Sequence, residues 1–75
     1  MSKKSTLREA INNTEQELEA LEGKLARSQT KLLLAIIDGN TPDKTEVEYF
    51  KLYASLIEKE RDELLRLNAE LNNLK

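Results

Sequence analysis

The sequence predicts an all-α protein: an antiparallel two-helix hairpin of the coiled-coil kind that dimerises into a four-helix bundle. Two observations carry this prediction, a seven-residue apolar repeat and a mirror symmetry about one short loop. In both halves of the chain apolar residues recur every three or four positions, as they do on one face of a helix. Four apolar pairs, one residue from each half, have residue numbers that sum to 82. Helices folded back on each other would bring these pairs level, so the predicted intramolecular seam is Ile11, Leu18, Leu25, Leu32, Phe50, Ile57, Leu64 and Leu71.

The composition agrees with long helices in one small domain that spans residues 1–75. Charged residues make up 35% of the chain, and there are only two Gly and one Pro. A high charged fraction together with a heptad repeat is typical of coiled coils. The absence of Cys and His excludes disulfides and thiolate zinc sites.

The first helix is expected over residues 6–37. Thr6 and Glu9 have the spacing of a capping box, in which each side chain satisfies a backbone group at the helix start. With Ile11 taken as heptad position a, small or apolar residues fill the a and d positions up to Ala35. Gly23 falls at an outward position and should cost the helix about 1 kcal/mol relative to Ala.

The chain is expected to reverse in a loop over residues 38–42. Gly39 suits the left-handed residue that follows a helix. Thr41 and Pro42 suit the N-cap and first position of the next helix, because Pro lacks the N–H that is unpaired there. The second helix is therefore expected over about residues 43–73, with a later start at Glu46, after Thr45, as the alternative.

Two packing frames are open for the second helix. In one, Phe50 and its heptad equivalents are d positions, and the a positions are Val47, Ala54, Arg61 and Asn68. This frame pairs Ser28 with Ala54 in a small layer and Thr14 with Asn68 in a polar layer that could fix the register. The competing frame is Phe50, Tyr53, Ile57, Glu60, Leu64, Leu67, Leu71 and Leu74. Both hold if the buried face is broad, as in a bundle of several helices.

Near the loop the chain is apolar nearly all round, which predicts a second, intermolecular face. The candidate partner or dimer interface is Leu33, Leu34, Ile37, Tyr49, Leu52, Tyr53 and Leu56. An apolar patch of this size on a monomer usually marks an interaction site. The expected function is a non-catalytic oligomerisation or protein-interaction module with a homodimer or another helical protein as partner. The alternatives are an adaptor hairpin that binds a different protein through the same patch, and weak nucleic-acid binding through a basic strip of Lys24, Arg27 and Lys31.

No enzyme chemistry, metal or cofactor is expected. Ser28 and Ser55 have no histidine to activate them as nucleophiles, and the acidic residues lack the His of di-metal helix bundles. Nucleic-acid binding favours a basic balance, whereas 12 Lys and Arg stand against 14 Asp and Glu. The longest apolar run, Leu32 to Ile37, is far shorter than the roughly 20 residues that span a bilayer. A cytoplasmic chain with neither a membrane partner nor a small-molecule substrate is the default expectation, either a complete small protein or an N-terminal fragment.

Overall fold

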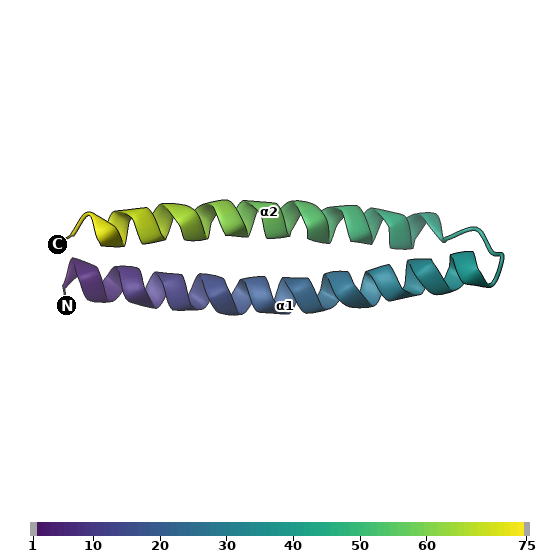
Figure 1. The fold of residues 1–75 in the computed structure, drawn as a ribbon, viewed down its shortest axis with the longest axis horizontal. Coiled ribbons are helices and arrows are strands. Elements are labelled where there is room, and N and C mark those ends of the chain that lie inside the picture. The colour runs from purple at the N-terminus through teal and green to yellow at the C-terminus, as the bar shows by residue number, and fades with distance from the viewer. Residues whose placement is uncertain (1, 75) are drawn as a thin grey trace.

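The chain forms two long helices that lie side by side and run in opposite directions (Figure 1). The computed structural model describes residues 2–74, in which α1 spans Lys3–Ile37 and α2 spans Lys44–Asn72. Both ends of the chain lie at one end of the rod and the loop lies at the other (Figure 1). The rod measures 56 × 16 × 14 Å. The prediction of an all-helical chain with two mutually packed helices is confirmed.

Helix α1 begins one turn earlier than the sequence indicated. Ser2 is its N-cap, and the backbone N–H of Ser5 donates to Ser2 Oγ at 3.1 Å. Thr6 lies inside the first turn, where its hydroxyl donates to the Ser2 carbonyl at 3.2 Å. The predicted start at Thr6 was wrong because Ser2 supplies the same kind of cap earlier and lets the helix gain a turn.

The loop confirms the predicted role of Gly39. This residue has φ of +76°, and its N–H donates to the Ile36 carbonyl at 3.0 Å. The N–H of Asn40 donates to the Ala35 carbonyl at 2.8 Å. These two bonds make a Schellman motif, which satisfies carbonyls that the helix end leaves free.

Helix α2 uses Asp43 as its N-cap. Asp43 Oδ1 accepts a hydrogen bond from the Thr45 N–H at 3.1 Å. The predicted cap at Thr41 with Pro42 as the first helical residue was wrong, as was the alternative start at Glu46. A carboxylate cap also interacts favourably with the positive end of the helix dipole. The helix ends at Asn72, with Asn73 as its C-cap.

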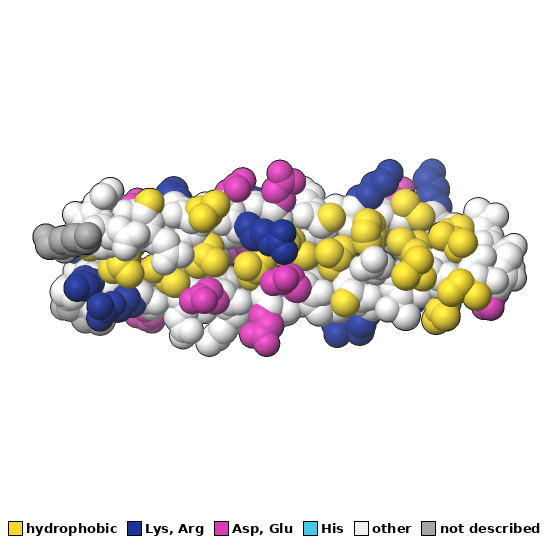
Figure 2. All heavy atoms as spheres, in the orientation of Figure 1, with side chains coloured by type: hydrophobic (Ala, Val, Ile, Leu, Met, Phe, Trp, Pro, Cys, Tyr) yellow, Lys and Arg dark blue, Asp and Glu magenta, His cyan; other side chains and the backbone are white. Residues whose placement is uncertain are grey.

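The seam runs the full length of the rod, and Figure 2 shows hydrophobic side chains following it between the helices. Of the eight predicted seam residues, Ile57 is buried and the other seven are half-buried. The remaining buried side chains of the described residues come from both helices: Leu7, Thr14, Ser28 and Leu67.

In its C-terminal half, α2 packs in the competing frame. Leu67 is buried and Glu60 is half-buried, whereas Arg61 and Asn68 are exposed. The predicted pairing of Thr14 with Asn68 was therefore wrong. Each of these two polar side chains instead bonds to the carbonyl four residues before it, Thr14 at 2.9 Å and Asn68 at 3.0 Å. Leucine takes the seam position because burying its side chain stabilises the fold and burying an amide does not.

Candidate functional site

The end of the rod near the loop exposes a group of large apolar side chains. We call this group the loop-end patch: Leu33, Leu34, Ile36, Ile37, Tyr49 and Leu52. Their exposed fractions run from 48% for Tyr49 to 75% for Ile37. In Figure 2 hydrophobic side chains broaden over both helices towards the loop end.

The patch overlaps the predicted interface without matching it. Five of the seven predicted residues are exposed and belong to the patch, while Tyr53 and Leu56 are half-buried. Ile36 was missed, although it lies in the same apolar run as its neighbours in the patch. Leu65 was missed too. It is 70% exposed but lies far from the loop on α2.

The patch extends around both sides of the seam. In the heptad frame of α1, Leu33 and Ile36 occupy b and e positions, on one side of the seam. Leu34 occupies a c position, on the other side. A partner that covers the patch therefore has to contact the hairpin on more than one face.

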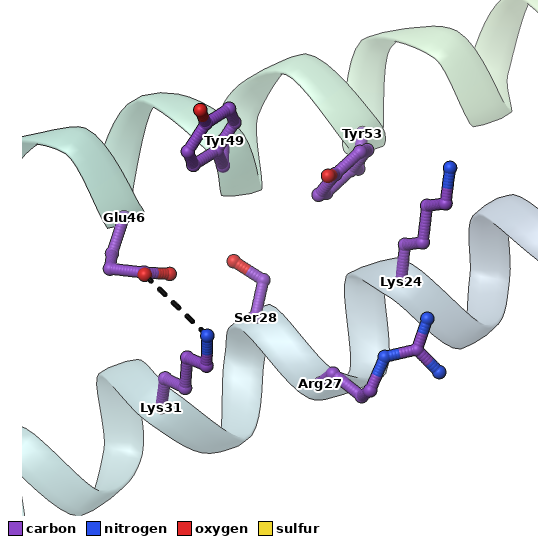
Figure 3. Close-up of a pocket in the computed structure, with 7 residues that line it drawn as sticks. All are labelled: Lys24, Arg27, Ser28, Lys31, Glu46, Tyr49 and Tyr53. Atoms are coloured by element: carbon purple, nitrogen blue, oxygen red, sulfur yellow. Dashed lines mark ion pairs between the residues drawn. The ribbon is translucent and has the colours of Figure 1, made fainter.

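A groove of about 340 Å³ lies between the helices next to the patch. We call it the basic groove, and it is lined by Lys24, Arg27, Ser28, Lys31, Glu46, Tyr49 and Tyr53. Figure 3 shows Ser28 between the two helices, with Lys24 and Arg27 on one side of it and Lys31 on the other. The two tyrosine rings of α2 stack on each other, with centroids 6.2 Å apart and planes 16° apart.

The lining of the groove is positively charged. Lys31 Nζ lies 3.7 Å from Glu46 Oε1, the one acidic group in the lining. Within residues 2–74, Lys24 and Arg27 have no ion-pair partner. Three cations and one anion give the lining a charge of +2, whereas the whole chain carries −2.

Ser28 places an unpaired hydroxyl in this groove. The residue keeps only 6% of its exposure, and its Oγ has no hydrogen-bond partner within the described part of the chain. Thr14 and Thr30 on the same helix each donate their hydroxyl to the carbonyl four residues earlier. Ser28 does not make that bond, so its Oγ is a buried polar atom without a hydrogen-bond partner in residues 2–74, which is uncommon in folded proteins.

Outside the groove, charged side chains flank the seam. Arg61 Nη2 lies 3.6 Å from Glu22 Oε2 across the seam. Arg66 lies outside the seam contacts and pairs along α2 with Glu63 and Glu70. The hydrogen bond from Arg66 lowers the pKa of Glu63 below its usual value, because the guanidinium stabilises the carboxylate.

Glu60 is a half-buried carboxyl at the seam, and its pKa is raised above the usual value. Burial raises the pKa of Glu60 first, since it disfavours the charged form. The hydrogen bond that protonated Glu60 donates to the Glu17 carboxylate raises the pKa of Glu60 further, as do the negative charges of Glu17 and Glu63, and Lys59 partly opposes them.

The residues that the structure describes include no cluster of three potential ligands able to hold a metal ion. Neither α1 nor α2 combines the length and the apolar character that a membrane crossing requires. Comparisons of the chain with protein-family models, with curated proteins and with solved structures found no match. The loop-end patch and the basic groove are therefore the two features from which a function can be argued.

Proposed function

We propose that this chain is a non-catalytic association module, in which two copies of the hairpin pair through the loop-end patch to form a four-helix bundle. The observation that carries the proposal is the large surface of the single hairpin. Its solvent-accessible surface is 5827 Å². A compact monomer of 8.6 kDa has about 4,700 Å².

The excess is of the size that a dimer interface removes. The difference is about 1,100 Å² per chain, against about 800 Å² that each partner buries in a standard interface. The exposed apolar side chains of the loop-end patch supply the kind of surface that is buried at the centre of an interface.

The core of one hairpin is small, so the chain is expected to need a partner to be stable. A second copy of the chain is a partner that is always available. Within residues 2–74, only Leu7, Ile57 and Leu67 are buried apolar residues, and no side chain there is fully buried. Proteins of this length usually need a disulfide, a metal or oligomerisation to be stable, and the chain has no Cys. A second copy fits because a charge of −2 per chain gives little repulsion between copies.

Sedimentation equilibrium of the purified chain tests the proposal. The native chain is expected at twice 8.6 kDa. The double variant Leu33→Glu/Leu52→Glu is expected as a monomer. It puts one charged side chain on α1 and one on α2 within the patch, and burying an unpaired charge in an interface is unfavourable. The control is Leu65→Glu, which makes the same kind of substitution at one exposed leucine outside the patch. Circular dichroism checks that all three chains remain helical.

Two results would reject the pairing of two copies through this patch. A native chain that sediments at 8.6 kDa at every concentration would reject the homodimer. The alternative would then be an adaptor, in which the patch binds a different helical protein. A Leu65→Glu chain that dissociates as fully as the double variant would move the interface away from the loop end.

A further inference from the structure

We infer that the basic groove is a binding site for a phosphate group, carried by inorganic phosphate or by a small phosphate monoester. The site does not depend on the proposed pairing of two hairpins. It shares only Tyr49 with the loop-end patch. Three features of the groove point to this ligand: its charge, the unpaired hydroxyl and its size.

The charge of the groove selects an anion. Lys24 and Arg27 project on the same side of Ser28 (Figure 3), and neither is neutralised by a carboxylate within residues 2–74. The pair of Lys31 and Glu46 closes the other side of the groove. The lining carries a charge of +2, whereas the whole chain has a net charge of −2. The groove is therefore a local concentration of positive charge on an acidic chain.

The hydroxyl of Ser28 gives the anion a fixed hydrogen bond. A buried hydroxyl without a partner is costly in the folded state, and a phosphate oxygen in the groove would accept a hydrogen bond from it. The planar guanidinium of Arg27, which lies beside Gly23 in the free chain, would turn towards the groove to bind two oxygens of the same phosphate, and the Lys24 ammonium would bind a third as a point charge. Together, the hydroxyl, the guanidinium and the ammonium would donate hydrogen bonds to different oxygens of a tetrahedral oxyanion.

The size of the groove limits the ligand. About 340 Å³ lies at the lower end of ligand pockets, which run from about 300 to 1,000 Å³. It holds a phosphate together with a small organic group, and it is too small to enclose a large cofactor. The tyrosine rings provide an apolar wall for that organic group.

Chemical-shift titration of the isotopically labelled native chain tests the site. The probes are inorganic phosphate and glycerol phosphate, each compared with sodium chloride at equal ionic strength. Both phosphates are expected to give saturable shifts confined to residues 24–31 and 46–53. Binding should weaken as salt is raised, because the cations of the groove are partly exposed to solvent.

Three variants separate a built site from general attraction of ions. Ser28→Ala keeps every charge and should bind about threefold to tenfold more weakly, because one hydrogen bond is lost. Lys24→Gln/Arg27→Gln should lose saturable binding. The matched control Lys51→Gln/Lys59→Gln removes the same charge from α2 outside the groove and should bind as the native chain does. Repeating the native titration on Leu33→Glu/Leu52→Glu, at a concentration where sedimentation shows monomer, tests independence from pairing.

Three outcomes count against the inference. Shifts no larger with phosphate than with chloride, or equal affinity in Ser28→Ala and the native chain, would show only unspecific attraction by exposed cations. If a single-stranded oligonucleotide gives saturable shifts and neither phosphate probe does, the groove would be a nucleic-acid contact instead. Saturable binding of only one phosphate probe would support the site: inorganic phosphate alone would restrict the ligand to the free ion, and glycerol phosphate alone would restrict it to monoesters.

Discussion

Ser28 is a residue at which stability and ligand binding are expected to oppose each other. Its hydroxyl is buried without a partner, so removing it should stabilise the fold. We expect Ser28→Ala to raise the free energy of unfolding by about 1 kcal/mol more than a serine-to-alanine change on the helix surface does. Urea unfolding measures this difference, with Ser55→Ala as the control, because Ser55 is an exposed serine with the same gain in helix propensity. A Ser28→Ala chain less stable than Ser55→Ala would mean that the hydroxyl has a stabilising bond.

The two glycines should respond to alanine with opposite signs. Gly39 has φ of +76°, a conformation that costs a residue with a Cβ about 1–2 kcal/mol, so Gly39→Ala should lower stability by about that amount. Gly23 lies inside α1, and an added Cβ would meet only Arg27 Nη1, at an ordinary 3.6 Å. Gly23→Ala should raise stability by about 1 kcal/mol. Thermal melts of both variants against the native chain measure the two signs, and two shifts in the same direction would contradict the account of the loop.

At the scale of the helices, α1 was more predictable than α2. One stripe of α1 holds nearly all its seam residues, so the sequence offered a single packing face. Helix α2 carries two overlapping apolar stripes. Whether Leu67 or Asn68 lies in the seam depends on the free energy of burying each side chain against α1, which the sequence of α2 alone does not give. The helix ends were less predictable, because Ser2 and Asp43 each compete with another capping residue within a turn. The basic groove could not be predicted, since it needs the strip of α1 beside the tyrosines of α2.

The frame that α2 adopts places Glu60 in the seam beside Glu17, with a consequence for pH. The raised pKa of Glu60 means that the folded chain binds this proton more tightly than the unfolded chain does. Stability from this residue is therefore present at low pH and falls as pH rises from the ordinary value of 4.5 through the raised folded value. Glu60→Gln, which stays uncharged, should have a higher Tm than the native chain at neutral pH, and this advantage should shrink as pH falls through the raised pKa of folded Glu60 towards 4.5.

The measurement is a series of thermal melts of Glu60→Gln and the native chain across that pH range. Glu63 contributes with the opposite sign, since Arg66 lowers the pKa of Glu63. Its stabilisation is lost as pH falls, in the native chain and in the variant alike. The Arg66–Glu63 pair is common to both chains, so the difference between them reports the titration of Glu60 together with its repulsion by Glu63. Glu17→Gln removes the same repulsion from the α1 side and should also raise Tm at neutral pH. A difference in Tm that does not change with pH would show that Glu60 titrates alike in the folded and unfolded chains.

At the scale of the whole molecule, the single hairpin is a rod rather than a compact domain. Its radius of gyration is 17.0 Å, whereas a compact chain of 75 residues has about 11 Å. Each helix packs on one neighbour only, and its other faces meet solvent. Pairing two rods, as proposed above, would give each helix further neighbours and so link folding to association.

This linkage makes the melting temperature depend on protein concentration. When folding and pairing are coupled, a tenfold rise in concentration stabilises the folded dimer by about 1.4 kcal/mol, which corresponds to a rise in Tm of several degrees for a small protein. We expect this rise for the native chain and for Leu65→Glu, measured by far-UV circular dichroism over a hundredfold range of concentration. Leu33→Glu/Leu52→Glu should melt at a lower temperature that does not change with concentration, because its unfolding is unimolecular. A native Tm that stays constant over the whole range would show that the seam alone stabilises the hairpin, and that the loop-end patch does not pair with a second copy.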